Sequence, residues 1–294
     1  MKLILKQDSW SNATAFYLED LYRKHFEISY DLDDEGIVYA HWQDWEWAKS
    51  LKRPAIIDHL WDPWDPEIVD TEYLKVIRSD GWFCIANECL WYRALGYDQY
   101  QAKNTNDRTF LMLMNYQRQY RDQLWEKIQP HLDNALYSYQ DRGVTIEGDI
   151  AREPGPWQRY LNKDWYDQTK YSLVVESGID QGVHSEKVLK PMAFRQPFVV
   201  WGPQGYLKWL RTWGFETFNN CIDESYDLEE DNNKRLEMIV EEVARINSMP
   251  SDYFIDQETQ RRLDTNYKRF YNVEWATKQI EKYFDQIKQY SSSW

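Results

Sequence analysis

The sequence of 294 residues lacks the features that mark several large classes of protein. Its three cysteines, Cys84, Cys89 and Cys221, are too few and too scattered for a disulfide framework or a zinc ribbon. Its 11 glycines and 10 prolines exclude collagen-like and low-complexity chains. No run approaches the roughly 18 apolar residues of a membrane-spanning helix, and the apolar run after Met1 is far shorter than a signal-peptide core. We therefore expect a cytoplasmic protein with no membrane segment.

Basic residues are also scarce, whereas aromatic residues are abundant. The chain has 35 Lys and Arg against 49 Asp and Glu, a net charge of −14, which argues against broad electrostatic capture of nucleic acid or of an anionic membrane. Aromatic residues make up 17% of the chain and include 16 tryptophans, more than a core alone usually takes. The hydrophobic content of 43% excludes a disordered chain.

Short apolar runs alternate with segments of helical spacing, which is the pattern of parallel α/β proteins. In the first third the predicted strands are 2–5, 36–40, 54–58 and 82–86, and the predicted helices are 13–25, 44–51, 71–77 and 88–95. The polar stretch 101–108 is interpreted as a linker. Beyond it the predicted strands are 109–114, 144–147, 171–176 and 197–201, and the predicted helices are 118–136, 185–195 and 206–213.

The alternation predicts an α/β fold of two Rossmann-like halves with a helical tail. The expected domains are an amino-terminal domain (1–107), a second domain (108–232) and carboxy-terminal helices (233–294) that pack back on the first domain. Residues 1–107 contain 11 basic and 20 acidic residues, so most of the excess negative charge lies in the first half.

Charged residues follow two neighbouring strands of the predicted second sheet. Glu176 ends one strand, Glu186 and Lys187 open the next helix, and Gly202 follows the next strand. Ligands of parallel sheets bind outside the carboxyl ends of the strands, where helix amino termini favour anions. A lysine there suits a phosphate, and a carboxylate beside it can hydrogen-bond ribose hydroxyls. This pattern predicts a site for a nucleoside diphosphate with an attached sugar.

At these residues the sequence resembles the donor-binding motif of α1,3-fucosyltransferases and of exostosin-like glycosyltransferases. Over about residues 108–227 it is also similar to uncharacterised glycosyltransferase-like proteins of tailed bacteriophages. The matching elements are Glu176-Ser177, the turn Ser185-Glu186-Lys187 and the strand that leads to Gly202. The resemblance implies a GT-B fold and transfer of a hexosyl or fucosyl group from a nucleotide sugar. The donor is then bound by the domain 108–232, and the acceptor lies on the side of the domain 1–107.

The resemblance also implies a role for each matching residue. The strand 110–114 and the residues after it are similar to the family's strand, loop and arginine, and that arginine contacts the donor pyrophosphate. By this match Arg121 takes the contact, with Arg118 as the second choice. Lys187 is then the other phosphate ligand and Glu186 the ribose ligand. Glu176 is either a catalytic carboxylate close to the donor sugar or a support of the loop.

Two departures from the family pattern bear on the donor and on the stereochemistry. Val183 stands where the fucosyltransferases place an aromatic residue that stacks on guanine, which leaves the donor open between UDP- and GDP-linked sugars. Lys190 stands where one retaining group of GT-B enzymes has a second glutamate, which favours inversion. The five histidines show no metal-ligand spacing, and Asp31-Leu32-Asp33 has the composition of a turn. We therefore expect neither a metal nor a permanently bound cofactor.

An inverting transfer needs a general base near the acceptor hydroxyl. The candidates in the first half are Asp58 at the end of the strand 54–58, its neighbours His59 and Asp62, and Glu88 after the predicted strand 82–86. Tryptophans are frequent in residues 42–64, and their indole faces can stack on sugar rings, although core packing is the alternative for most of them. The predicted acceptor contacts are His59, Trp61 and Trp64.

The acceptor and the activity itself have alternatives. A glycan or a small molecule suits the acidic first half better than DNA does. If the phage resemblance holds, a hydroxymethylated base in phage DNA is another acceptor, and the protein then works in the host cytoplasm. A different class of function is a non-catalytic carbohydrate-binding protein that keeps a GT-B shell and binds sugars through its tryptophans.

Overall fold

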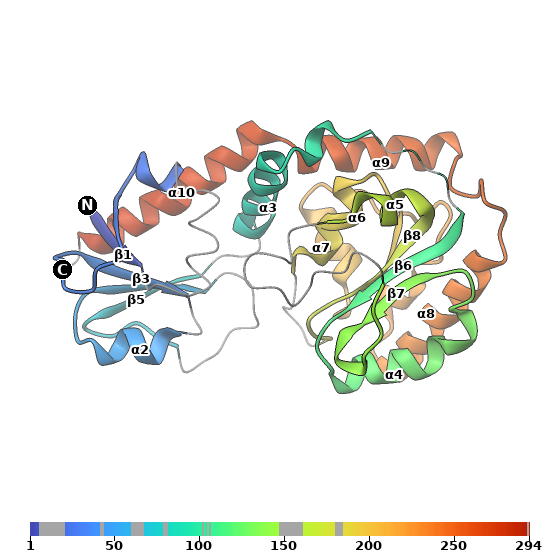
Figure 1. Cartoon of the computed structure of the whole chain (residues 1–294), viewed down its shortest axis with the longest axis horizontal. Helices are drawn as coiled ribbons and strands as arrows, with labels where there is room; N and C mark the ends of the chain where they lie inside the picture. Colours follow the sequence, from blue (N-terminus) through green and yellow to red (C-terminus); the bar gives the residue numbers. More distant parts are fainter. Residues whose placement is uncertain are drawn as a thin grey trace. The chain divides into compact units, whose positions relative to one another are not determined.

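The computed structural model describes residues 1–5, 21–41, 44–59, 68–78, 82–101, 103, 105, 107–146, 161–179, 185–292 and 294. The chain forms two compact units (Figure 1), of which the first contains Met1–Leu95 and Asn272–Trp294 and the second Gly96–Tyr271. Each unit is built on one sheet whose strands all pair in parallel. The predicted fold class, α/β with two Rossmann-like halves and a helical carboxy-terminal stretch, is confirmed.

The first unit has a five-stranded sheet with the strand order β2-β1-β3-β4-β5. Its strands are β1 (Lys2–Leu5), β2 (Glu27–Ser29), β3 (Ile37–His41), β4 (Ala55–His59) and β5 (Leu74–Arg78). Its described helices are α2 (Trp45–Ser50), α3 (Trp82–Ala94) and α10 (Val273–Ser291). The apolar runs of β3 and β4 are buried on both faces, as in strands that helices cover.

The second unit has a four-stranded sheet with the order β7-β6-β8-β9. Its strands are β6 (Arg108–Met114), β7 (Leu136–Tyr139), β8 (Thr169–Val175) and β9 (Phe198–Trp201). Its described helices are α4 (Gln119–Ile128), α5 (Lys163–Gln168), α6 (Leu189–Ala193), α7 (Tyr206–Thr212), α8 (Asn232–Asn247) and α9 (Gln257–Phe270). Short 3₁₀ turns are η2 (Tyr97–Gln99), η3 (Gln129–His131), η4 (Gln140–Arg142), η6 (Glu186–Val188) and η7 (Ser225–Leu228).

The strand order has a consequence for ligand binding in the second unit. From β6 the chain moves to one side of the sheet, to β7, and then returns past β6 to β8. The strand order therefore reverses between β6 and β8, and the connections that leave their carboxyl ends run to opposite sides. This topological switch point is where open parallel sheets bind their ligands.

The predicted strand 82–86 is wrong, because these residues form the start of helix α3. An apolar run of five residues is compatible with a buried strand or a buried helix, and periodicity cannot distinguish them. The run continues for 13 residues, which is long for a strand, and α3 is buried on nearly all sides from Cys84 to Tyr92. A helix enclosed in this way shows no amphipathic pattern.

Three further predictions differ from the structure. The predicted helix 71–77 is wrong, since Leu74–Arg78 pairs with β4 as strand β5. The predicted helix 118–136 is too long, because α4 ends at Ile128 and Pro130 cannot continue it. The strand that pairs with β6 is β7, whereas Val144 of the predicted strand 144–147 forms only an isolated bridge. The strand β2 and the helix α5 were not predicted.

The other predicted strands, 2–5, 36–40, 54–58, 109–114, 171–176 and 197–201, are confirmed to within two residues at each end. The predicted helices 44–51 and 206–213 are confirmed, the segment 185–195 is a 3₁₀ turn followed by the short α6, and the carboxy-terminal segment is helical. Most of the predicted helix 13–25 lies outside the described residues.

The two units divide at 95/96 and 271/272, whereas the expected boundaries were 107 and 232. Side chains of the expected linker explain the first difference. Tyr97 and Tyr100 pack against the ring of Phe194, and Asp167 accepts hydrogen bonds from the Tyr100 hydroxyl and from the Lys103 backbone N–H at 2.8 Å. These contacts attach the segment before β6 to the second unit.

The carboxy-terminal helices divide between the units. Helix α9 is attached to the second unit by an ion pair of Asp264 with Arg195 (2.9 Å) and by hydrogen bonds of Asn266 with the backbone of Glu216. Helix α10 belongs to the first unit, where Phe284 packs edge-on against Tyr22 at a centroid distance of 4.7 Å. Among the helices after residue 232, α10 therefore belongs to the first unit, and α8 and α9 belong to the second.

Candidate active site

The carboxyl edge of the second sheet brings together the residues that the sequence predicts to bind a donor. Asn115 follows β6, Glu176 follows β8 and Gly202 follows β9. Val175 and Trp201 are partners in the parallel register, so Glu176 and Gly202 leave the sheet side by side. A Cβ added to Gly202 would lie 3.1 Å from Cγ of Glu176, which shows how closely the two chains approach.

Glu176 is fully buried, and its carboxylate is held by hydrogen-bond donors from three parts of the chain. Oε1 accepts from the Tyr206 hydroxyl at 2.5 Å and from the Ser185 backbone N–H at 3.3 Å. Oε2 accepts from the Ser185 hydroxyl at 2.5 Å and from the Ser177 N–H at 3.1 Å. A buried carboxylate requires such partners. Because both oxygens are engaged, this geometry fits the loop-supporting role of Glu176 rather than proton transfer.

Lys187 lies directly beside this carboxylate network. Its ammonium donates to the hydroxyls of Ser177 (2.7 Å) and Ser185 (2.9 Å), and its side chain keeps 23% of its area exposed. The Glu186 carboxylate lies 3.6 Å from the same ammonium and 3.8 Å from that of Lys190. The turn therefore presents a partly exposed cation and a carboxylate next to each other, as the binding of a phosphate and a ribose requires.

Arg121 connects the loops that follow β6 and β8. Its side chain is buried, with Nη2 donating to the carbonyl of Glu176 and Nη1 to the carbonyl of Tyr116, both at 2.9 Å. Its Nε has no hydrogen-bond partner among the described residues. Arg118, the second choice, is exposed and serves as the N-cap residue of α4, where its carbonyl accepts the N–H of Arg121. Of the two arginines, Arg121 is the one that touches the Glu176 loop.

Sequence reasoning missed the aromatic residues that complete this edge. The Tyr120 hydroxyl donates to the carbonyl of Glu176 at 2.9 Å, and the Trp201 indole donates to the carbonyl of Tyr120 at 3.2 Å. Tyr206 binds the Glu176 carboxylate from the first residue of α7. In a chain with 22 tyrosines and 16 tryptophans, none of these residues stands out before the fold is known.

Glu176→Gln is expected to lower the free energy of unfolding by about 2–3 kcal/mol. The backbone N–H groups of Ser177 and Ser185 donate to different oxygens of the carboxylate. A glutamine has only one acceptor oxygen, so one of these N–H groups faces an NH₂ group in either amide orientation. Urea denaturation measures the effect, and Glu237→Gln, on an exposed glutamate of α8, is the control. An unchanged urea midpoint for Glu176→Gln would contradict this assignment.

In the first unit, Asp58 lies at the carboxyl end of β4 and is 2% exposed. Its Oδ2 accepts a hydrogen bond from the Tyr39 hydroxyl at 2.7 Å, and that hydroxyl lies 2.6 Å from the hydroxyl of Tyr283 on α10. Its Oδ1 has no hydrogen-bond partner among the described residues. Burial raises the pKa of Asp58 to about 7, although the hydrogen bond from Tyr39 opposes this rise. A carboxylate with such a pKa is suited to general-base chemistry near neutral pH.

The remaining candidates of the first half have less support. Glu88 does not follow a strand, since it lies inside α3 and is fully buried. The backbone of His59 ends β4, next to Asp58, and its side chain is outside the description. Trp61, Asp62 and Trp64 lie outside the described residues, as does Val183 in the second half.

The structure holds no metal-binding geometry in its described part. No group of three or more His, Cys, Asp or Glu side chains is placed there to hold a metal ion. The predicted turn at Asp31 is confirmed, because its carboxylate accepts the N–H of Asp33 at 3.0 Å and its carbonyl accepts that of Asp34 at 3.2 Å. Among the described helices, none is both long enough and apolar enough to cross a bilayer.

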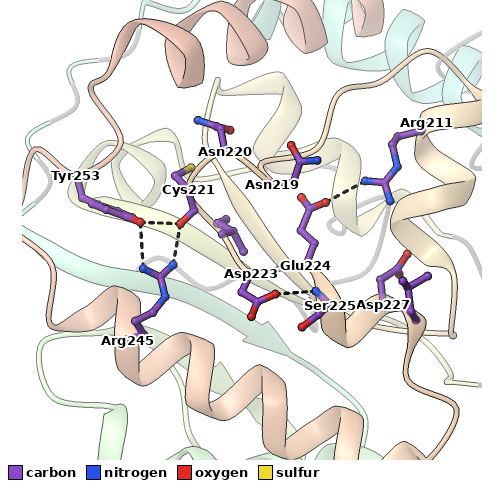
Figure 2. A pocket seen from close by; sticks show the side chains of 12 residues that line it. Arg211, Asn219, Asn220, Cys221, Asp223, Glu224, Ser225, Asp227, Arg245 and Tyr253 are labelled. Carbon is purple, nitrogen blue, oxygen red and sulfur yellow. Dashed lines mark hydrogen bonds and ion pairs between the residues drawn. The ribbon is translucent and has the colours of Figure 1, made fainter.

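The second unit also contains a concavity of about 670 Å³, whose lining differs from the edge described above. Figure 2 shows its lining, which comes from the end of α7, the loop after it, α8 and the segment that follows α8. The two arginines that line it are both ion-paired, Arg211 with Glu224 at 2.9 Å and Arg245 with Glu242 at 2.6 Å. None of the predicted donor-binding residues lines it, and its cations are already neutralised.

Comparisons with known proteins give matches in structure only. No protein-family model matches the sequence, and no curated protein sequence matches it. The chain is similar to the crystal structure of an α1,3-fucosyltransferase with a TM-score of 0.44 and 7% identity, over 94% of this chain and 91% of the other. It is also similar to an α1,3-fucosyltransferase crystallised with GDP-fucose, with a TM-score of 0.43 and 10% identity, over 93% of this chain and 82% of the other.

Proposed function

We propose that the protein is a glycosyltransferase that moves a sugar from a nucleotide-sugar donor to an acceptor hydroxyl. One observation supports this proposal above the others. At the switch point of the second sheet, the ammonium of Lys187 and the guanidinium of Arg121 are both held to the Glu176 loop, one through serine hydroxyls and one through a carbonyl. Cations at the carboxyl edge of a parallel sheet are suited to a diphosphate.

In this proposal the donor diphosphate binds at Lys187 and Arg121, and its ribose hydroxyls bind the Glu186 carboxylate. The acceptor oxygen attacks the anomeric carbon of the sugar, and the bond from that carbon to the diphosphate oxygen breaks. Asp58 accepts the proton of the acceptor hydroxyl, and the nucleoside diphosphate leaves with the bonding electrons. Such a displacement inverts the anomeric centre and needs no metal if the two cations stabilise the leaving diphosphate.

The donor and the acceptor are specified only by class. The donor is a UDP- or GDP-linked hexose or fucose, and the acceptor is a glycan or a small molecule with a free hydroxyl. The acidic composition of residues 1–107 favours such an acceptor over DNA, whose phosphates would be repelled. A hydroxymethylated DNA base is the alternative acceptor, and a strong salt dependence of duplex binding would reveal it.

A panel of nucleotide sugars tests the proposal. The purified protein is incubated with UDP- and GDP-linked sugars, first in a thermal-shift assay and then in an assay for released nucleoside diphosphate, with and without glycan acceptors. We expect one donor to raise the melting temperature and to be cleaved. A non-catalytic carbohydrate-binding protein would release no nucleotide from any donor, and this outcome would overturn the proposal.

A further inference from the structure

A second arginine of this unit is buried and forms no ion pair with any described residue. Arg235, on α8, is 2% exposed, and its Nη2 donates to the carbonyl of Gly202 at 2.9 Å. Its guanidinium carbon lies 5.1 Å from the ring centroid of Trp201. Neither Nε nor Nη1 has a hydrogen-bond partner among the described residues. An arginine buried with unused N–H groups is unusual, because desolvating its charge is costly.

The two carboxylates that attract Arg235 bind other groups. Asp227 accepts the backbone N–H groups of Leu207 and Lys208 at the start of α7, at 2.9 and 3.1 Å. Glu229 forms an ion pair with Lys234 at 2.5 Å. Both carboxylates attract Arg235 from a distance, yet neither forms an ion pair with it, and burial lowers the pKa of Arg235. The two arginines labelled in Figure 2, in contrast, each form an ion pair, Arg211 with Glu224 and Arg245 with Glu242.

Arg235 lies on the same edge of the sheet as Arg121. Arg121 donates to the carbonyl of Glu176 and Arg235 to that of Gly202, and these two residues follow neighbouring strands. Trp201 lies between the two arginines in this set of contacts. Its ring faces the guanidinium of Arg235, and its indole N–H donates to the carbonyl of Tyr120, the residue before Arg121. Their helices α4 and α8 run side by side in Figure 1 and contact each other.

Two buried cations at one edge destabilise each other unless an anion compensates them. The Glu176 carboxylate does not serve this purpose directly, because its four hydrogen bonds all come from neutral donors. The charge of a buried group acts over longer distances than in water, since the surrounding protein screens it weakly. The edge therefore carries two buried arginines that form no ion pair among the described residues, and only more distant carboxylates offset the charge of Arg235.

We propose that Arg235 is a positioning residue for the donor diphosphate, acting through Gly202 and through its unpaired charge behind the carboxyl ends of β8 and β9. This inference rests on the proposed function and extends its anion site from the loop residues to α8. Arg235 does not have to touch the ligand, because it holds the Gly202 carbonyl and adds to the positive potential at the site. Its charge is a cost in the free protein that diphosphate binding removes.

The test compares Arg235→Met with Arg235→Lys and with Arg245→Met, a control on the same helix whose arginine is paired with Glu242. Titration calorimetry gives the affinity for inorganic diphosphate, UDP and GDP, and thermal denaturation gives the stability of the free protein. For Arg235→Met we expect about tenfold or greater loss of affinity for these anions, with an unchanged or higher melting temperature, because a buried unpaired charge has been removed. Arg235→Lys keeps the charge and retains most of the affinity.

The control variant is expected to lose stability and to keep its affinity. Arg245→Met removes the cation that is paired with Glu242, so its melting temperature falls while its affinity for diphosphate stays the same. A melting temperature of Arg235→Met that falls as far as that of the control, with unchanged affinity for the three anions, would overturn the inference and leave Arg235 a structural residue. If the wild-type protein cleaves a nucleotide sugar and Arg235→Met binds it equally well, the inference fails and the proposed function stands. If the wild-type protein binds none of the anions, both fail.

Discussion

Lys187→Ala is expected to lower kcat/KM for sugar transfer by at least about 100-fold. The Lys187 ammonium is the partly exposed cation of the site, and the two serine hydroxyls that it contacts orient it beside the Glu176 loop. In the proposed reaction negative charge builds up on the leaving diphosphate, and a cation that is already in place stabilises it without reorganisation. Release of nucleoside diphosphate from the preferred donor measures the effect.

A matched control separates this effect from a general loss of positive charge. Lys127 of α4 forms an ion pair with Glu237 of α8 at 3.1 Å, with both side chains exposed, in the same unit as Lys187. Lys127→Ala should leave kcat/KM unchanged, since an exposed pair of this kind contributes little. Both variants should melt within a few degrees of the wild type. Full activity in Lys187→Ala would remove the basis for placing the diphosphate at this turn.

Asp58→Asn is expected to lower kcat by about 100-fold or more, because the amide cannot accept the proton of the acceptor hydroxyl. The pKa of about 7 predicts that the wild-type rate falls as the pH drops below 7, since the carboxyl is then protonated. Tyr39→Phe removes the hydrogen bond that favours the ionised carboxylate, so the midpoint of this pH profile should move above 7. A profile that is flat from pH 6 to pH 8 would exclude Asp58 as the base.

The stability of the wild type should change with pH in the opposite sense to its activity. The pKa of Asp58 is raised in the folded protein from its ordinary 3.8 to about 7, so the folded state holds the proton over a range in which the unfolded chain releases it. The wild type therefore loses stability as the pH rises from about 4 to about 7, by about 4 kcal/mol in all. The asparagine variant avoids this loss.

Urea denaturation at several pH values measures this difference. We expect Asp58→Asn to be more stable than the wild type at pH 8 and to lose that advantage toward about pH 3, where the aspartic acid is mostly neutral in the folded and the unfolded state. Glu46→Gln, on an exposed residue of α2, is the control and should show no such dependence. An equal difference between Asp58→Asn and the wild type at all pH values would show that the Asp58 carboxyl is not perturbed by burial.

The strands that sequence reasoning located share one property. Runs such as Ile56-Ile57 in β4 and Val199-Val200 in β9 are short, apolar and rich in branched side chains, and they are buried on both faces. That pattern is local, and it suits a strand that helices cover. The run 82–86 is equally short and apolar, although Ile85 is its only β-branched residue, and its helical form depends on what encloses it.

The edge to which we assign the donor was predictable in part for the same reason. Ser185, Glu186 and Lys187 are consecutive, and Glu176 lies only nine residues before Ser185, so a strand followed by a turn is enough to bring them together. Arg235 is 33 residues from its partner Gly202, and nothing in its local sequence distinguishes it from other arginines on helices. Its burial without an ion pair is visible only after α8 has been placed against β9.

The sequence by itself determined the α/β class, most of the strands and the cluster of charged residues around Lys187, because each depends on neighbours along the chain. Only the tertiary structure decided which charged side chains are buried away from water. Asp58 acquires its raised pKa because it is buried beside Tyr39, whose hydroxyl meets that of Tyr283, 244 residues away from Tyr39 in the sequence. The cost of burying a charge depends on every group that packs around it, and the spacing of residues along the sequence does not determine that packing.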